Sequence, residues 1–549
     1  MLQQARGLLF AFLITVLLGA CSKVPDNARY VPDDAIIVAG INLSALSDKI
    51  AWNLITGSKL FKEIKKRMPA ENAGDIVEGI ENAGLDVSNT FYVYTKYDTR
   101  FAGGKMIAGL IPITDAKSLE GFLKKAFPGV AIVQRQEMKE AALGGGVYAR
   151  WSTNLLIIID APLMPQDDEE AATDSAANVL LVAEMDKAFN VPGTNSIINN
   201  KRFSGFEAHR HDLSFWVNYG SILSGFSDDG SLNINGVTLS PAMLKDAVLT
   251  AGFEFRKGQI AADVNYYLPS KVEEATKDFG TVEADKEMLD RLPKNNMDML
   301  LAMHISPAGV KTLLEKAGLF GLTNMGLATQ GLDADFLLEA FTGDMAVMMS
   351  DFSLAAELKK DEFMGQVVEH KSQKVGVTMT YVIRINKKEN FERLMELVKK
   401  NGMQPLKGGG YVLPLTTSDS VFLLLNEQYA VISSKRKYAA GFLDGSFKKD
   451  KMGDLYADQV YGQPFAMCID VKELFRNIDP AISNSPRDSA IISESKKLLD
   501  NITVTGGKYE DNAYKFGMEV NFINTDENSI LELIDFGMKI KDLADKRNL

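Results

Sequence analysis

The sequence has no excess of basic residues and, after its N-terminal segment, no long apolar run. Acidic residues outnumber basic residues by 72 to 60, which gives a net charge of −12. Nucleic acid would be repelled at long range, and the same sign disfavours a broad electrostatic grip on anionic lipid head groups. The apolar stretch Leu155–Ile159 has the length of a strand rather than of a membrane-spanning helix. A folded, globular body with no nucleic-acid partner is expected.

Common catalytic motifs are also missing. The sequence contains no Gly-x-Ser-x-Gly, His-Glu-x-x-His or Cys-x-x-Cys pattern. Two glycine triplets, Gly144–Gly146 and Gly408–Gly410, are not followed by a Lys-Ser/Thr pair at a helix start, so we expect tight turns or bulges before strands. The sequence therefore offers no catalytic, cofactor-binding or metal-ligating residue, and it favours a protein that is not an enzyme.

Some single residues invite a functional interpretation that the surrounding pattern does not favour. His209 and His211 form the only histidine pair, but a zinc site needs further ligands, so a polar loop before a strand at Leu213 is expected. Cys468 lies in an apolar strand and is expected to be a small core residue rather than a nucleophile. Asp344 follows Gly343 and is expected to cap a glycine turn. Methionines cluster at 297, 299 and 303 and at 345, 348 and 349, where irregular core filling is the common role and an adaptable binding face the alternative.

The N-terminal residues have the pattern of a lipoprotein signal peptide. Arg6 precedes an apolar run from Leu8 to Leu18, and Gly19-Ala20 precede Cys21. The run is too short to span a bilayer comfortably, and Leu18-Gly19-Ala20-Cys21 resembles the lipobox of bacterial lipoproteins. We expect residues 1–20 to be removed and Cys21 to carry the lipid that anchors the chain to a membrane. Cys468 would then have no disulfide partner, so stability must come from packing.

The residues after Cys21 suit a short tether, which we assign to 21–27. Ser22 is compatible with transfer to the outer membrane, while Lys23 followed only by Asp26 is a weak signal for surface export. We therefore expect a cell-envelope protein located at the outer membrane, and the sequence leaves open whether it faces the periplasm or the cell surface. The leaflet and oligomeric state also stay open.

Five segments recur in the same order with offsets between 252 and 274. Pro32–Ser44 aligns with Pro293–Ser306, and Met106–Gly129 with Met379–Gly402. The other three pairs are Val147–Asp160 with Val421–Ser434, Phe215–Leu223 with Met467–Phe475, and Gly258–Tyr266 with Tyr514–Phe522. This order predicts a tandem duplication with halves at 28–285 and 286–540, followed by a charged tail at 541–549.

The offset falls between the third and fourth pairs, so the first half contains extra residues there. An acidic, turn-prone stretch, Met164–Ala177, fits a solvated surface insertion near 164–178. The two halves therefore differ mainly at this place.

Within each half, strand and helix periods alternate. Ala35–Leu43 is predicted as a strand buried on both faces, Lys105–Ile113 as a strand, and Val147–Trp151 with Leu155–Ile159 as a hairpin. Helical stripes occur at Leu119, Phe122, Leu123 and Ala126 and again at Phe391, Leu394, Met395 and Val398.

A strand followed by a helix cap recurs at Asn42, Asn218, Ser306 and Asp470, and Pro307 fits a first helical position. We predict an α+β fold in which each half has a mixed or antiparallel sheet packed by helices.

The lipobox, the opening Pro-x-x-Ala-x-x-x-x-x-Ile-Asn-Leu and the repeat over nearly the whole mature chain together resemble one family. This family is the Bacteroidota lipoproteins with domain of unknown function 4836. The resemblance implies an envelope lipoprotein and transfers no active site. The lipid-bearing Cys21 is argued from its own flanking residues.

Three hypotheses for function follow. The first is a lipid-anchored, non-enzymatic binding or scaffold module for an envelope protein or glycan, because duplicated halves create clefts or extended faces. The second is an envelope hydrolase with a dispersed active site, and the third a periplasmic chaperone for outer-membrane assembly. Converging ionisable groups in a pocket would favour the enzyme, and a broad apolar patch would favour partner binding.

Overall fold

The computed structural model describes residues 24–49, 82–101, 104–161, 170–223, 232–234, 237–239, 246–270, 273, 276–294, 297–316, 318–363, 366–400, 403–407, 409–414, 420–449, 459–483 and 485–545. The predicted signal peptide, Cys21 and the start of the tether lie outside the described residues. So do residues 164–169 of the predicted insertion and 546–549 of the predicted tail.

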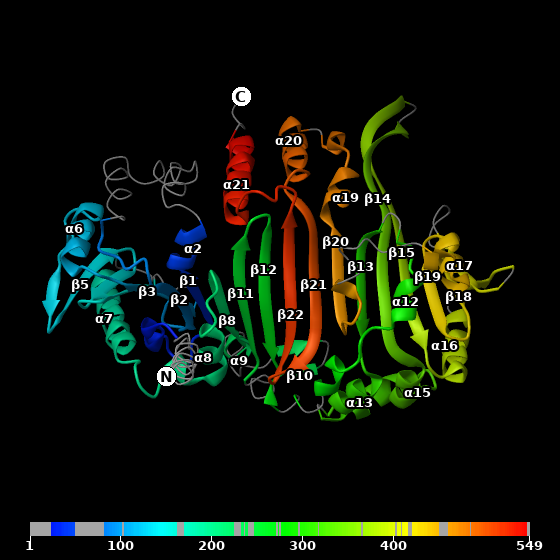
Figure 1. Cartoon of the computed structure of the whole chain (residues 1–549), viewed down its shortest axis with the longest axis horizontal. Helices are drawn as coiled ribbons and strands as arrows, with labels where there is room; N and C mark the ends of the chain where they lie inside the picture. Colours follow the sequence, from blue (N-terminus) through cyan, green and yellow to red (C-terminus); the bar gives the residue numbers. More distant parts are fainter. Residues whose placement is uncertain are drawn as a thin grey trace, which may run out of the picture. The chain divides into compact units, whose positions relative to one another are not determined.

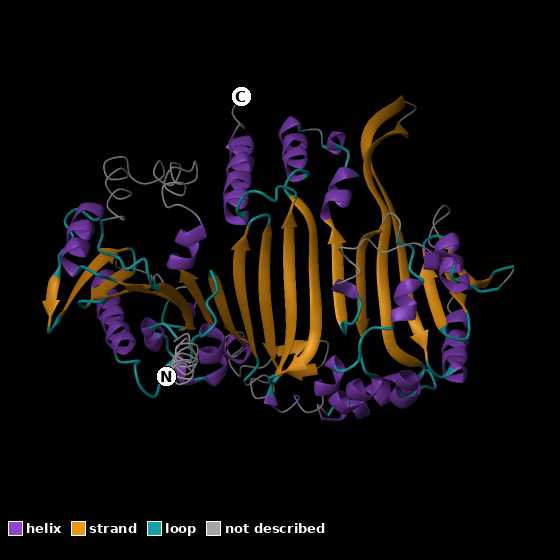
Figure 2. Cartoon of the chain, in the orientation of Figure 1, coloured by secondary structure: helices purple, strands orange, loops and turns teal. Residues whose placement is uncertain are grey.

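Internal contacts divide the chain into two compact units, residues 1–254 and 255–549. Both contain antiparallel sheets and helices, which confirms the α+β class (Figures 1 and 2). No helix among the described residues is long and apolar enough to cross a membrane.

The sheet of the first unit is antiparallel throughout its described pairings. From one side to the other its strands are β11 (Val248–Arg256), β8 (Leu213–Asn218), β1 (Ile37–Asn42), β2 (Thr90–Tyr97), β3 (Lys105–Pro112), β7 (Leu155–Asp160), β6 (Val147–Trp151), β5 (Met138–Gly144) and β4 (Val133–Arg135). The predicted hairpin is confirmed as β6 and β7, with Arg150 opposite Ile157. Separate strands β9 (Leu232–Ile234) and β10 (Val237–Leu239) form a small hairpin.

The sheet of the second unit has the order β12 (Gln259–Tyr267), β22 (Ala513–Phe522), β21 (Leu499–Glu510), β20 (Phe465–Asp470), β13 (Met297–His304), β14 (Phe341–Phe363), β15 (Gln366–Ile385), β19 (Tyr429–Ser433), β18 (Ser420–Leu425), β17 (Tyr411–Pro414) and β16 (Gln404–Pro405). Strand β12, which belongs to the first half by sequence, pairs here with β22. The hairpin of β14 and β15 continues past Ser350, where β14 leaves its neighbour β13 (Figure 2).

The order of the strands across the sheet is the same in the two units. In the first unit the order β8-β1-β2-β3-β7-β6-β5-β4 corresponds, strand by strand, to β20-β13-β14-β15-β19-β18-β17-β16 in the second. Four of the five aligned sequence pairs fall on strands that correspond in this order: for example, Val147–Asp160 contains β6 and β7, and Val421–Ser434 contains most of β18 and all of β19. The fifth pair lies on β12 and β22, which pair with each other in the second unit.

Helices connect or cover the strands of each unit. In the first unit they are η1 (Asp26–Tyr30), α2 (Leu43–Lys49), α6 (Ala116–Ala126), α7 (Glu170–Phe189), η3 (Ile197–Asn199), α8 (Lys201–Glu207) and α9 (Tyr219–Leu223). Helix α7 includes residues 170–177 of the predicted insertion. Leu119 and Leu123 of the predicted stripe on α6 are buried against β5, β6 and β7.

In the second unit the helices are η4 (Lys277–Gly280), α12 (Lys286–Asp290), α13 (Pro307–Lys316), α14 (Phe320–Ala328), α15 (Ala334–Glu339), α16 (Lys388–Lys400), α17 (Arg436–Asp444), η5 (Ser446–Lys449), α19 (Val471–Arg476), η6 (Pro480–Ile482), α20 (Pro486–Ser495) and α21 (Ser529–Asp545). Helices α19, α20 and α21 lie beyond one end of the strands and α13 and α15 beyond the other (Figure 1).

The predicted helix caps at strand ends are confirmed at all four places. The Oδ1 atom of Asn42 accepts from Ala45 N at 3.1 Å, and that of Asn218 accepts from Ser221 N at 3.1 Å. Ser306 Oγ accepts from Gly309 N at 3.2 Å, and Asp470 Oδ1 accepts from Glu473 N at 2.8 Å. Pro307 begins α13 as predicted. These bonds satisfy N–H groups that a first helical turn leaves without partners.

One prediction for β1 is wrong. The strand is not buried on both faces, because Val38, Gly40 and Asn42 are buried whereas Ile37 is 38% exposed. An apolar run shows that either face of a strand can be buried, but only the packing of the sheet decides which face other elements cover.

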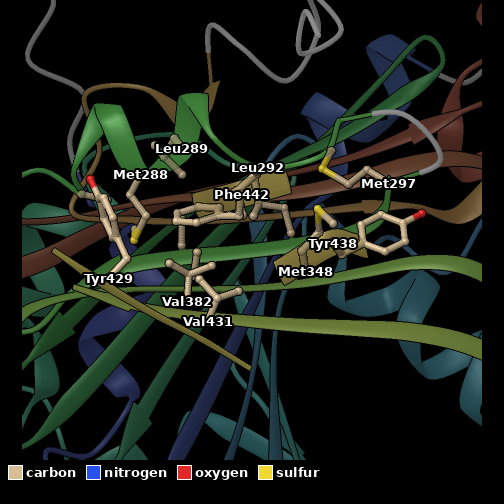
Figure 3. Packing of buried hydrophobic residues seen from close by; sticks show 14 of the residues in the cluster. Met288, Leu289, Leu292, Met297, Met348, Val382, Tyr429, Val431, Tyr438 and Phe442 are labelled. Atoms are coloured by element: carbon tan, nitrogen blue, oxygen red, sulfur yellow. The ribbon is translucent and has the colours of Figure 1, made fainter. Parts of the chain in front are cut away.

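The core of the second unit is formed between its sheet and helices α12 and α17. Met288, Leu292 and Phe442 are fully buried there, and Met348 and Val382 meet them from the sheet (Figure 3). Met297 and Met348 are buried members of this cluster, as expected for core-filling methionines, whereas Met299, Met303, Met345 and Met349 are only partly buried.

Candidate functional site

The histidine pair lies in the loop between α8 and β8, as predicted. His209 Nδ1 is 3.0 Å from the carbonyl oxygen of Gly205. The His211 ring stacks on Phe206 with centroids 5.1 Å apart, and a Cβ at Gly252 would lie 2.4 Å from this ring. Glycine at 252 therefore leaves the space that His211 occupies. Among the described residues, no group of three or more His, Cys, Asp or Glu side chains could hold a metal ion.

This loop borders a polar cavity of about 220 Å³ in the first unit. The cavity walls come from the first residues of the described chain, the end of β1, the start of β2, the end of α8 and the loop before β8. The lining residues are Val24, Pro25, Asp26, Gly40, Asn42, Ser44, Ser88, Asn89, Thr90, Glu207, His209, Arg210, His211 and Ser214. Uncharged hydrogen-bonding side chains are interleaved with acidic and basic ones, so no single sign of charge dominates.

A buried carboxyl group lies in the wall of this cavity. Glu207 is 8% exposed, and its Oε2 accepts a 2.6 Å hydrogen bond from the hydroxyl of Tyr92. Burial raises the pKa of Glu207, although hydrogen bonds from Ser214 and Tyr92 oppose the rise. Burial, together with the nearby Glu207 charge, also raises the pKa of Tyr92. The carboxyl group therefore keeps its proton to higher pH than an exposed glutamate.

The strand position next to Glu207 requires glycine. A Cβ at Gly40 would lie 2.3 Å from Ser214 Oγ and 3.0 Å from Tyr92 Cε1. Gly40 and Ser214 are register partners across β1 and β8, so the absent side chain gives Ser214 and Tyr92 room to reach Glu207. The small residue thus shapes the cavity wall.

Other lining residues of the cavity are held by local hydrogen bonds. Asn42, which caps α2, also accepts from Ser44 Oγ at 2.9 Å. Asp86 accepts from the backbone N–H of Ser88 at 3.1 Å and from Asn89 Nδ2 at 2.7 Å. These bonds fix the cavity residues on two turns, so the wall is preformed.

A second cavity of about 200 Å³ shares two lining residues with the first. Asp26 and Asn89 line both. The other lining residues are Asn27, Arg29, Tyr30, Asp86, Pro112, Ile113, Asn154 and Leu155. The two hollows therefore extend the polar surface around η1.

The remaining sequence candidates lie outside these cavities. Cys468 is 1% exposed on β20, and burial raises its pKa to about 12, which confirms its role as a core residue. Gly144–Gly146 have positive φ and form the turn between β5 and β6, and Gly409 and Gly410 also have positive φ before β17; Gly408 lies outside the described residues. The first triplet therefore acts as a turn, and the described glycines of the second precede a strand as predicted.

The prediction for Asp344 is wrong in its local structure. The residue lies inside β14 beside a bulge, and it is 5% exposed rather than at an open turn. Its Oδ1 lies 2.9 Å from His304 Nδ1, and its Oδ2 accepts from Thr342 Oγ1 at 2.9 Å. Burial tends to raise the Asp344 pKa, but these two hydrogen bonds and the charges of His304 and Arg384 together outweigh it, and the pKa is lowered. Gly343 marks an irregularity inside β14 rather than a turn before it: the register with β15 shifts between Phe341 and Met345, while Asp344 pairs with His304 of β13.

Sequence reasoning missed Gly40, Tyr92, Glu207 and Ser214. A weak signal was present, because Glu207 directly follows the apolar Phe203 and Phe206 on α8, and a glycine interrupts the apolar run of β1. Neither signal indicates that the four residues lie close together, because they are up to 174 positions apart in the chain (Gly40 to Ser214).

The raised pKa of Glu207 predicts a pH-dependent stability difference. A carboxyl group with a raised folded-state pKa binds its proton more tightly when folded, so stability falls as pH rises from the unfolded pKa towards the folded one. Glu207→Gln removes this titration and can still accept from Tyr92. We expect its melting temperature, relative to wild type, to increase between about pH 4 and pH 8. Glu427→Gln, at a side chain 85% exposed, is the control and should show no such trend; parallel curves for Glu207→Gln and wild type would contradict the prediction.

The fold and cavity define an α+β protein with antiparallel sheets and a small polar cavity. No protein-family model matches the chain, and no curated protein matches it. Among solved structures, crystal form IV of TP0453 is similar with a TM-score of 0.23 and 12% identity, covering 44% of this chain and 81% of that one. Crystal form III has a TM-score of 0.26 and 11% identity, covering 48% and 88%.

Proposed function

We propose that this chain is a lipid-anchored protein of a bacterial cell envelope that binds a sugar unit of an envelope glycan without acting as an enzyme. Its proposed anchor is Cys21, exposed by removal of residues 1–20, and its proposed location is the outer membrane. The observation that carries the binding role is the polar cavity lined by Val24, Pro25 and Asp26.

The position of the cavity along the chain supports this proposal. Cys21 and Val24 are three positions apart in the sequence, a distance of at most about 11 Å in extended chain. A lipid on Cys21 would therefore hold the cavity close to the membrane surface, where envelope glycans and lipid-linked sugars are found.

The chemistry of the lining supports a polyhydroxylated ligand. Six of the lining side chains are Asn, Ser or Thr, which donate and accept hydrogen bonds without net charge; they are Asn42, Ser44, Ser88, Asn89, Thr90 and Ser214. Carboxyl, imidazole and guanidinium groups from Asp26, Glu207, His209 and Arg210 add stronger partners of both signs. A neutral sugar matches this mixture better than a strongly charged ligand does.

The tandem origin of the two halves is part of the proposal. The shared strand order, the aligned segments and the four capped corners support one ancestral α+β unit copied head to tail. The resemblance to the Bacteroidota lipoproteins with domain of unknown function 4836 is consistent with this body and anchor.

A second candidate is a hydrolase, favoured by the proton that Glu207 retains in a cavity shared with Asp26. A protonated carboxyl and a second carboxylate are the groups that most glycosidases use. Release of reducing sugar from envelope glycans by the purified protein, lost in Glu207→Gln, would support it.

Loss of the proposed lipid is the first test. Cys21→Ser is expected to abolish incorporation of a labelled fatty acid into the protein completely, because it removes the only proposed acyl acceptor. Cys468→Ser changes the other cysteine, which is buried, and should keep the label. Labelling that survives in Cys21→Ser would rule out this anchor.

Site-specific photo-cross-linking in intact cells tests the cavity. A photoreactive residue at Arg210, on the rim, is expected to give a glycan adduct, whereas one at the exposed Lys124 on α6 should not. Asn89→Trp should reduce the Arg210 adduct by about tenfold by filling space that both cavities share. Equal adducts at both positions would contradict the proposal, and a single protein adduct at Arg210 would favour the scaffold or chaperone hypothesis.

A further inference from the structure

Helix α14 is apolar, yet none of its residues is buried. Leu322 is 50% exposed and Met325 is 66% exposed. The segment from Ala317 to Leu332 has no charged residue, in a chain in which 24% of residues are charged. A surface helix normally turns a polar face to water, so this helix departs from the usual pattern.

The outward side of α14 is the apolar one. At about 100° per residue, Phe320 and Leu327 lie on one side of the helix and Leu322 and Met325 on the opposite side. Lys311 Nζ of α13 is 5.7 Å from the centre of the Phe320 ring, which places the Phe320 side towards α13. Leu322 and Met325 consequently point away from α13.

The polar side chains of α14 and its C-terminal end already have partners within the protein. Thr323 Oγ1 donates to the carbonyl oxygen of Leu319 at 2.9 Å, and Thr329 Oγ1 donates to that of Gly326 at 2.8 Å. Asn324 Oδ1 accepts from Ala334 N at 2.7 Å. Internal satisfaction of polar groups is what a hydrocarbon environment requires, because no water is present there to donate or accept hydrogen bonds.

We propose that α14 inserts its Leu322 and Met325 side into the hydrocarbon of a membrane leaflet. With nine residues the helix is too short to span a bilayer, so it would lie at the interface. A lipid surface fits better than a protein partner because the helix is uncharged around its whole circumference and uses these hydroxyl and amide groups internally. A protein-binding face usually offers hydrogen-bonding groups to its partner. This membrane contact is independent of the proposed lipid on Cys21 and of the cavity.

The test uses the chain from residue 22 onward, which keeps every described residue and lacks the proposed signal peptide and lipid. Flotation with neutral phosphatidylcholine vesicles is expected to recover this protein, and added salt should not release it. Leu322→Ser with Met325→Ser should lower the vesicle-bound to free ratio by at least about tenfold. The control, Val87→Ser with Val179→Ser, removes side chains that are 53% and 67% exposed elsewhere and should bind like the parent.

A second measurement locates the helix directly. Tryptophan emission from Leu322→Trp is expected to be quenched by lipids with brominated acyl chains, and that from Val179→Trp should not be. Three flotation results would overturn the proposal: no flotation of the parent, equal flotation of the two double variants, or binding only to anionic vesicles with release by salt. Conversion of a dimer to a monomer by the Leu322/Met325 change would also overturn it. Unchanged melting temperatures establish that the variants are folded.

Discussion

Phe442→Ala is expected to destabilise the second unit by about 3–5 kcal/mol, because it removes a large ring from a fully buried site. Phe442 lies on α17, at the centre of the cluster in Figure 3, and its ring meets the Tyr429 ring edge to face with centroids 5.2 Å apart. The lost ring leaves a cavity that the sheet and α12 can fill only in part. The melting transition of this unit should fall by roughly 10 °C.

Two variants serve as controls for this change. Phe442→Leu retains part of the volume and should cost clearly less than the alanine variant. Phe127→Ala makes the same change at a site that is 38% exposed, and should shift the transition little. An unchanged transition in Phe442→Ala would mean that this cluster does not hold the unit together.

Arg150→Met is expected to destabilise the first unit by about 3–5 kcal/mol, because it takes from a buried carboxylate its nearest and only buried cationic partner among the described residues. Arg150 on β6 is 1% exposed and lies directly opposite Glu140 on β5. Its Nε donates to Glu140 Oε2 at 2.8 Å, and its Nη1 donates to Asp186 Oδ1 of α7 at 2.6 Å. Urea denaturation followed by a probe in this unit measures the change.

Arg135→Met is a matched control for this variant. Arg135 also contacts Glu140 and Asp186, at 3.6 Å and 3.2 Å, but it is 43% exposed, so its removal should cost about 1 kcal/mol or less. Adding Glu140→Gln to Arg150→Met removes the unpaired charge and should recover part of the loss. Equal effects of the two arginine variants would show that burial does not govern this network.

Local features of the fold could be predicted from the sequence. The caps at Asn42, Asn218, Ser306 and Asp470 depend on bonds to residues three positions away. The hairpin of β6 and β7 and the helix at Leu119 and Leu123 follow from periods of two and of about 3.6 residues. These signals lie within one element or between elements that are adjacent in the chain, so they can be recognised without knowledge of the tertiary contacts.

The cavity could not be predicted in the same way. Glu207 is a candidate site residue only because the Tyr92 hydroxyl donates a hydrogen bond to it and Gly40 leaves space for Ser214. From its sequence alone, the apolar segment of α14 would also be predicted to be an ordinary core helix, and only its packing shows that Leu322 and Met325 remain exposed. Solvent exposure is a property of the assembled layers and not of the residue types.

The sequence by itself determined the α+β class, the helix starts and the burial of Cys468, since short-range hydrogen bonds and hydrophobic periodicity act over a few residues. Tertiary structure alone decided which face of β1 is covered, the pairing of β12 with β22, and the meeting of Gly40, Tyr92, Glu207 and Ser214. These outcomes depend on strand order and register, which are set by the packing of the whole sheet and can bring together residues more than a hundred positions apart.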